Sequence, residues 1–167
     1  MNRQPISIFN FQFSIFILLL TASCSNHEVY SESYSFPSET WMRFEPHTFE
    51  ANIPNSEECY ELYVTLDIDT LRYREQALPL TFKVISDQGE TRTFFASVML
   101  RSSDGNSLGQ SDGQGHLIFR QRVKDYFYFN QPGHYSVSIG QRTSRYEIKG
   151  IRKITFTVNK AKLEMPE

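Results

Sequence analysis

Cys24 is the side chain whose surroundings point most directly to chemistry. It follows an apolar run, Phe13 to Leu20, and three small residues, Thr21 to Ser23, and Arg3 is the only charged side chain before it. A positive start, an apolar middle of about 7 to 15 residues and small residues before a cut are typical of an export signal that is removed. The run is too short for a bilayer span, which takes ~20 nearly continuous apolar residues. The sequence therefore predicts cleavage of residues 1–23.

Cleavage at this point makes Cys24 the first residue of the mature chain. The arrangement resembles the signal of a bacterial lipoprotein, in which this cysteine is acylated and holds the protein at a membrane. The alternative is an ordinary cleaved signal, which would leave a free thiol at the new terminus. Because an unpaired cysteine is an unusual group to leave exposed on an exported protein, we predict that Cys24 is the lipid attachment site.

Cysteine and histidine, which commonly act as nucleophiles or metal ligands, show no site pattern elsewhere. Cys59 has no disulfide partner if Cys24 carries lipid, so we expect a buried, small apolar side chain in a fold held by its core. A catalytic thiol needs a base beside it, and the sequence shows no such pairing. The histidines lack the spacing of about two to five residues that zinc ligands use. We expect four surface histidines: His27, His47, His116 and His134.

The glycine-rich stretch DGNSLGQSDGQG, residues 104–115, invites comparison with a calcium loop. Asp104 and Asn106 occupy the first two ligand positions of such a loop. Leu108 stands where a third oxygen ligand belongs, and Gly115 stands where a bidentate Glu is needed. We therefore interpret the stretch as a long, flexible connection between strands, and we expect no metal site and no cofactor.

Charge and carboxylate placement favour neither an enzyme nor a nucleic-acid binder. Asp67 and Asp69 would share a strand face, but solvated acids are ordinary at the end of a strand. The chain has 17 Lys and Arg against 19 Asp and Glu, a formal net charge of −2. No basic cluster provides the footprint that nucleic-acid binding requires. We expect a protein that is not an enzyme and has no nucleic-acid partner.

The stretch DYFYFNQPGHY, residues 125–135, carries five aromatic side chains. Neighbours on a strand point to opposite faces, so we expect Phe127 and Phe129 in the core and Tyr126 and Tyr128 outside. Two outward tyrosines form an aromatic platform of the kind that stacks on sugars or packs against a partner protein. The simpler interpretation is that both pack beneath the N-terminal segment or a neighbouring loop. Tyr126 and Tyr128 are the candidate contacts with a partner or a glycan.

Alternation of apolar and polar residues with period two begins after Trp41 and is typical of strands with one buried face. Turn-forming residues separate the alternating segments. The segments are residues 47–53, 60–68, 78–84, 93–100, 117–123, 133–139 and 153–158. They predict an all-β protein, an antiparallel β-sandwich of about seven to eight strands. We divide the chain into a signal peptide (1–23), a lipidated polar tether (24–40) and one sandwich domain (41–167).

A set of residues between positions 30 and 158 has a distinctive order and spacing. They are Tyr34, Pro37, Trp41, Phe49, Ile53, Tyr60, Tyr73, the LPL at 78–80, Gly89, the stretch at 104–115, the FNQPGHY at 129–135, Gln141, Arg142 and the KGI at 149–151. In this order and spacing the chain resembles the GldH family of gliding-motility lipoproteins. The resemblance implies a non-enzymatic component of the gliding-motility apparatus or a related envelope assembly, with envelope or motility-machinery proteins as partners.

For location and for function we state one main hypothesis and one alternative. Ser25 after the cysteine is not an acidic retention signal, and the polar tether has no acidic run of the kind expected for surface export. We expect an outer-membrane lipoprotein that faces the periplasm, with surface exposure as the other orientation. The alternative function is a carbohydrate-binding surface lipoprotein, suggested by the sandwich pattern and by Tyr126 and Tyr128.

Lipidation makes a prediction about mass. Protein extracted from membranes should begin at Cys24 and exceed the mass of the bare mature chain by that of its acyl groups, because the thiol and the new amino terminus are where lipid is attached. Intact-mass spectrometry measures this directly. A mature chain that starts at Cys24 without added acyl mass would refute the anchor.

Overall fold

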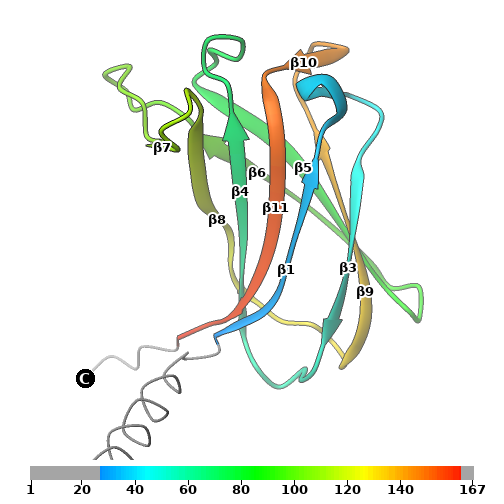
Figure 1. Cartoon of the computed structure of the whole chain (residues 1–167). Helices are drawn as coiled ribbons and strands as arrows, with labels where there is room; N and C mark the ends of the chain where they lie inside the picture. Colours follow the sequence, from blue (N-terminus) through cyan, green and yellow to red (C-terminus); the bar gives the residue numbers. More distant parts are fainter. Residues whose placement is uncertain (1–26, 163–167) are drawn as a thin grey trace, which may run out of the picture.

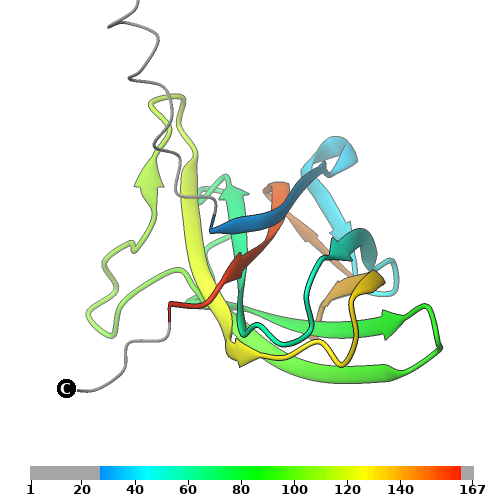
Figure 2. The ribbon, with the colours of Figure 1, turned by 90° about the horizontal axis from the view of Figure 1, so that it is seen from below.

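Two antiparallel β-sheets face each other in the computed structural model, which describes residues 27–162 (Figure 1). The first sheet has the order β1–β11–β4–β8–β7. Its strands are β1 (Glu28–Ser35), β11 (Ile151–Lys160), β4 (Tyr60–Ile68), β8 (Leu117–Phe127) and β7 (Gln110–Ser111). The second sheet, in the order β3–β9–β5–β6, consists of β3 (His47–Ile53), β9 (Gly133–Gln141), β5 (Ala77–Ser86) and β6 (Thr91–Met99). Figure 2 shows the two layers from one end.

A third, two-stranded sheet pairs β2 (Thr40–Met42) with β10 (Glu147–Lys149), after the 3-10 turn η1 (Pro37–Glu39). The predicted all-β antiparallel sandwich is confirmed. Residues 27–162 contain eleven strands, more than predicted, partly because β2, β7 and β10 have only two or three residues and cannot show a period. No helix in this range is both long and apolar enough to cross a bilayer.

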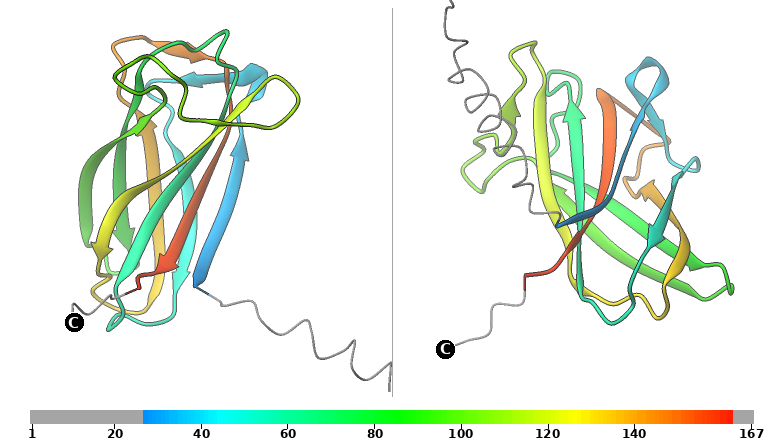
Figure 3. Two further views of the ribbon diagram at one scale, coloured as in Figure 1. Left: turned by 90° about the vertical axis from the view of Figure 1, so that its left-hand side faces the viewer. Right: turned by 60° about the horizontal axis from the view of Figure 1, so that its bottom comes forward.

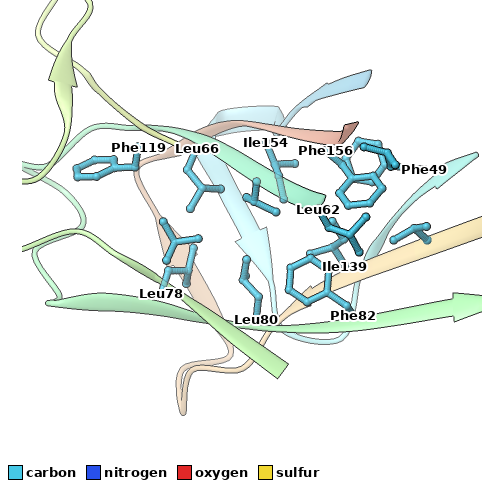
Figure 4. Packing of buried hydrophobic residues seen from close by; sticks show 14 of the residues in the cluster. Phe49, Leu62, Leu66, Leu78, Leu80, Phe82, Phe119, Ile139, Ile154 and Phe156 are labelled. Carbon is cyan, nitrogen blue, oxygen red and sulfur yellow. The ribbon is translucent and has the colours of Figure 1, made fainter. Parts of the chain in front are cut away.

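The core forms where the apolar sides of the two sheets meet (Figure 4). In β4 the buried alternate side chains are Tyr60, Leu62, Val64, Leu66 and Ile68. The facing set from β5 is Leu78, Leu80, Phe82 and Val84. Both sets are those that the alternation predicts. Each fully buried side chain of this size contributes about 1.5–3 kcal/mol to the stability of the folded state relative to an exposed one. The alternation of apolar and polar residues therefore favours this sandwich.

The prediction that residues 24–40 form a tether is wrong for residues 28–40. β1 pairs with β11 along its whole length, from Glu28 to Ser35. The polar composition hid the strand, because an edge strand needs few apolar contacts when its backbone is paired. Tyr30 and Tyr34 pack against the core, while Ser31 and Ser33 on the other face hydrogen-bond to threonines of β11.

Both ends of the described chain emerge at the same end of the sandwich (Figure 3). The backbone amide of Lys160 donates to the carbonyl of His27 at 2.6 Å. The connection between β6 and β8 lies at the opposite end (Figure 1). Since β1 begins at Glu28, only residues 25–27 separate Cys24 from the first strand.

The connection from residue 100 to residue 116 is ordered by short-range hydrogen bonds, where the sequence suggested a flexible link. Arg101 and Ser107 form an isolated bridge, and the amide of Ser102 donates to the carbonyl of Asn106 at 2.9 Å. Gly109 packs so close to Phe119 that a Cβ there would lie 2.7 Å from the ring. The connection is therefore a folded part of the domain.

Gly150 joins β10 to β11 where a side chain cannot fit. Its φ is +89°, and a Cβ would lie 2.8 Å from the carbonyl oxygen of Asp69 and 2.9 Å from Cβ of Arg72. Its amide donates to the carbonyl of Glu39, and its carbonyl accepts from the amide of Asp69, both at 2.8 Å. This glycine thus ties η1 and the turn after β4 to the start of β11.

A pair of alanine variants separates this close contact from backbone strain. Gly89 also has a positive φ, +82°, but nothing lies within 4 Å of a Cβ there. Gly89→Ala should lower the free energy of unfolding by about 1 kcal/mol through strain alone. Gly150→Ala should cost a further ~1–3 kcal/mol from the forced contact. Urea unfolding measures both, and equal losses would show that the contact is unimportant.

Candidate functional site

β8 leaves regular pairing with β4 near its end. Leu62 pairs with Lys124 and Tyr60 pairs with Phe127, so three steps along β8 match two along β4. This β-bulge twists the strand and re-aims its side chains. Tyr126, within the bulge, has a φ of +49°, in the left-handed region that favours glycine. A non-glycine residue there costs on the order of 1–2 kcal/mol, so the surrounding packing holds the backbone in place.

The predicted division of the aromatic residues at the end of β8 is confirmed. Phe127 and Phe129 are buried, with their ring centroids 4.8 Å apart. Tyr126 is 62% exposed and Tyr128 is 50% exposed. The simpler interpretation, in which both tyrosines pack beneath the N-terminal segment or a loop, is wrong, because half or more of each side chain remains exposed.

The structure brings Tyr126 and Tyr128 to one shallow groove of about 450 Å³, which we call the aromatic groove. It lies between β8 and β6, the edge strand of the other sheet. Phe94 and Phe127 line it, together with Arg92, Thr93, Lys124 and Asn130. The groove therefore combines aromatic surface with two cationic side chains.

Arg92 and Lys124 are positioned by the aromatic rings around them. The guanidinium of Arg92 lies 4.3 Å from the centroid of Phe127 and donates to the carbonyl of Tyr128 at 2.6 Å. Nη2 of Arg92 is buried without a hydrogen-bond partner among the described residues. Nζ of Lys124 lies 5.9 Å from the centroid of Phe94. These cations make the aromatic groove suited to a partner that offers hydrogen-bond acceptors or negative charge.

The structure describes only one of the two cysteines for which the sequence made a prediction. Cys24 lies outside the described residues. Cys59 is buried, as predicted. Its thiol neighbours Tyr128, and hydrogen bonding with this thiol raises the pKa of the tyrosine above its usual value. Cys59 therefore neighbours one of the two exposed tyrosines of the aromatic groove.

A second group of polar side chains was not predicted. Asp67, Asp112, His116 and Arg152 meet on the outer face of the first sheet, and we call this group the polar cluster. The expectation that Asp67 is a solvated acid is wrong, since it is only 5% exposed. The expectation of a surface His116 is also wrong, since its side chain is 20% exposed. Asp67 is buried and His116 is partly buried where the turn between β7 and β8 meets the end of β4.

Backbone hydrogen bonds fix the geometry of this turn. Oδ1 of Asp112 accepts from the amide of Gln114 at 2.7 Å and from that of His116 at 3.1 Å. The bond from Gln114 is the main cause that lowers the pKa of Asp112. The turn therefore presents an ionised carboxylate and an imidazole from positions four residues apart.

Two of the other three histidines are exposed and one is partly buried. His27 and His134 are exposed, as predicted. His47 is partly buried, because its ring stacks on Tyr34 with centroids 3.7 Å apart, and burial lowers its pKa. The sequence signal for the polar cluster was the Asp112–His116 spacing, which a search for paired histidines overlooks.

Residues 105–109, GNSLG, have the spacing of the Gly-x-Ser-x-Gly elbow of serine hydrolases, a motif that the sequence reasoning overlooked. The elbow requires a turn from a strand into a helix. Ser107 instead lies exposed in the connection before β7, and its Oγ accepts from the amide of Gly109 at 3.3 Å. This context does not support a nucleophilic serine.

A comparison with protein families assigns the chain. The family model of the GldH lipoprotein matches residues 28–158. This chain belongs to the GldH lipoprotein family. The resemblance seen in the sequence is thus confirmed, and the protein is a membrane-anchored lipoprotein of the cell envelope. A comparison with curated proteins gives no match.

Solved structures resemble the chain only distantly. AlgX of Pseudomonas aeruginosa is 10% identical over 81% of this chain and 27% of its own, with a TM-score of 0.38. Xylanase10C of Cellvibrio japonicus is 12% identical over 81% of this chain and 28% of its own, with a TM-score of 0.40. This chain thus spans about a quarter of either protein. The CBM22-1 xylan-binding domain of Paenibacillus barcinonensis is 9% identical over 82% and 96% of the two chains, with a TM-score of 0.37.

The strain at Tyr126 yields a prediction with opposite signs at neighbouring positions. Tyr126→Gly should raise the free energy of unfolding by about 1 kcal/mol, because glycine adopts the left-handed conformation without strain. Tyr128→Gly should lower it by at least about 0.5–1 kcal/mol, since Tyr128 has no positive φ, glycine adds chain entropy, and the half-buried ring is lost. Urea unfolding of the two variants tests this. A loss of stability in Tyr126→Gly would contradict it.

Proposed function

We propose that this lipoprotein is a non-enzymatic component of the gliding-motility apparatus or of a related envelope assembly, and that it binds a partner protein through the aromatic groove. The family match supports the assembly role. The observation that carries the binding surface is Tyr126, a large exposed side chain kept at a backbone position where glycine is cheaper. Strain of this kind clusters at functional sites.

The composition of the groove supports binding over catalysis. The described residues that line it offer aromatic rings, two cations, a threonine and an asparagine. No carboxylate, histidine or cysteine, the side chains that most often act as general acids, general bases or nucleophiles, is among these lining residues. Exposed tyrosines and an arginine are the side chains that most often anchor a protein interface.

The proposed lipid on Cys24 constrains where the groove lies. Four residue steps from Cys24 to Glu28 span at most about 14 Å, so the end of the sandwich where β1 begins must stay near the bilayer. Tyr126 also lines a hollow together with His27 and Lys160, which lie at that same end. The partner that reaches the aromatic groove is therefore itself held close to the membrane. We propose the periplasmic face of the outer membrane as that location.

A carbohydrate-binding surface lipoprotein is the second candidate. The exposed pair Tyr126 and Tyr128 favours it, because tyrosine rings stack on sugars. Arg92 and Lys124 in the same groove would then select an anionic glycan. Surface exposure of the lipoprotein would accompany this function.

Complementation of a strain that lacks the gene tests the proposal. The double variant Tyr126→Gly, Tyr128→Ala should reach the membrane fraction at the normal level. It should nevertheless fail to restore the spreading of colonies by gliding, because the groove loses both tyrosines that contact the partner. Tyr146→Ala removes a tyrosine that is 64% exposed and lies outside the groove, so it should restore spreading. Spreading is measured on soft agar and protein level by immunoblot.

Two results would contradict the proposal. Full restoration by the double variant would show that the aromatic groove binds no essential partner. Specific binding of the unaltered protein on a glycan array, lost on Tyr128→Ala, would replace the partner protein with a carbohydrate ligand.

A further inference from the structure

Three potential ligand atoms of the polar cluster converge on one point. A carboxylate oxygen of Asp67, one of Asp112 and a ring nitrogen of His116 all lie within 4.8 Å of one another. Nδ1 of His116 is 3.7 Å from Oδ1 of Asp67 and 3.6 Å from Oδ2 of Asp112. Ligands about 2.1 Å from a tetrahedral metal ion lie about 3.4 Å from one another. The two distances from Nδ1 of His116 are within a few tenths of an ångström of this value, and the two carboxylate oxygens, which lie within 4.8 Å of each other, would close on the ion by turning their side chains.

One of these atoms is buried and unpartnered. Oδ1 of Asp67 has no hydrogen-bond partner among the described residues, and the residue is only 5% exposed. Burial of an ionised oxygen is unfavourable unless a cation or a hydrogen-bond donor meets it. Because this oxygen points toward His116 and Asp112, the missing cation or hydrogen-bond donor would have to lie where the three side chains converge.

Arg152 does not provide this missing hydrogen-bond donor. Its Nε lies 3.7 Å from Oδ2 of Asp67, and its Nη1 lies 3.8 Å from Oδ2 of Asp112. Both distances exceed the range of a direct hydrogen bond. Its guanidinium donates instead to Nδ1 of His116, so this nitrogen directs its lone pair into the cluster. Two carboxylates against one guanidinium leave the cluster one negative charge in excess.

We infer that Asp67, Asp112 and His116 form a binding site for a divalent transition-metal ion of the zinc type. Two carboxylates and one imidazole are ligands that such an ion accepts, and three protein ligands leave a fourth position for water. The side chain of Arg152 is 40% exposed, so it can turn outward into solvent and release the lone pair of His116. The inference departs from the sequence-based expectation of no metal site, and it does not depend on the proposed function.

A second histidine shows that carboxylate neighbours alone do not make such a site. His134 also lies near two carboxylates, but Glu50 is 3.3 Å from Nε2 while Asp87 is 3.3 Å from Nδ1. The two acids thus approach opposite sides of the ring, and both are exposed. At His116 the two acids approach the same nitrogen, which is the geometry that one ion requires.

Metal binding would fasten the turn between β7 and β8 to the first sheet. Asp67 belongs to β4, whereas Asp112 and His116 belong to the turn. The turn between β7 and β8 lies at the end of the sandwich opposite the ends of the described chain (Figure 1). Binding would therefore stabilise the folded loop region that faces away from the proposed lipid anchor.

The test uses the full chain in detergent micelles, stripped with EDTA and desalted. Calorimetric titration with Zn²⁺ should show one ion bound per chain, and Co²⁺ should give the visible absorption of a four-coordinate site. Excess Mg²⁺ or Ca²⁺ should not displace either ion, because one ligand is an imidazole. Zn²⁺ should also raise the midpoint of thermal unfolding, since it binds the folded state.

Variants separate this site from other metal-binding groups. Asp67→Asn and His116→Gln should each weaken Zn²⁺ binding by at least about 100-fold, more than the loss expected from an outer-shell change. His134→Gln is the matched control and should bind as the unaltered chain does. Arg152→Gln should bind at least about 10-fold more tightly, because it removes a competing positive charge next to the ion. Circular dichroism without metal verifies that each variant is folded.

Three outcomes would overturn the inference. One is the absence of stoichiometric binding in the unaltered chain, which would make the cluster a purely ionic contact. Another is undiminished binding in a folded His116→Gln variant, which would place the ion elsewhere. The third is equal weakening by His134→Gln and His116→Gln, which would indicate nonspecific binding to surface histidines.

Discussion

The two-residue period of β4 is the constraint on which the rest of the structure depends. Its even-numbered side chains, from Tyr60 to Ile68, enter the core between the sheets. The odd-numbered side chains must therefore point outward, which places Asp67 on the outer face beneath the turn that follows β7. The same strand pairs with β8, and the two-against-three register at Tyr60 creates the bulge that directs Tyr126 outward. Both candidate sites thus follow from one strand's register.

The aromatic groove and the polar cluster differ in how they are stabilised. At the groove, buried Phe127 and Phe129 fix the chain on either side of Tyr128, so the core maintains the strained backbone at Tyr126. At the cluster, the backbone turn at Asp112 is satisfied while a buried oxygen of Asp67 is not. At the groove the unfavourable free energy arises from the backbone conformation of Tyr126. At the cluster it arises from the unpartnered, buried oxygen of Asp67. Each cost is understandable if a ligand or partner offsets it.

The sequence predicted those features that depend on local alternation. The buried sets of β4 and β5 follow from the pleat, and the division of tyrosines and phenylalanines at the end of β8 agrees with it although the strand carries a bulge there. β1 was missed because its stability comes from pairing with β11, which the composition of residues 28–35 does not reveal. The polar cluster was missed because it joins residues 67, 112, 116 and 152, whose proximity depends on how the turn folds over β4.

The two sites should act independently, because β8 connects them as a rigid element. β8 has eleven residues from its start near the polar cluster to its end at the aromatic groove, and its ten steps span at most about 33 Å at the rise of a strand. Energetic effects at sites this far apart usually add, and coupling would require an element with two alternative arrangements. β8 is held by β4 along its length, and its bulge lies at the groove end. An ion in the polar cluster would therefore stabilise the loops at its end of the sandwich without altering the aromatic groove at the other end.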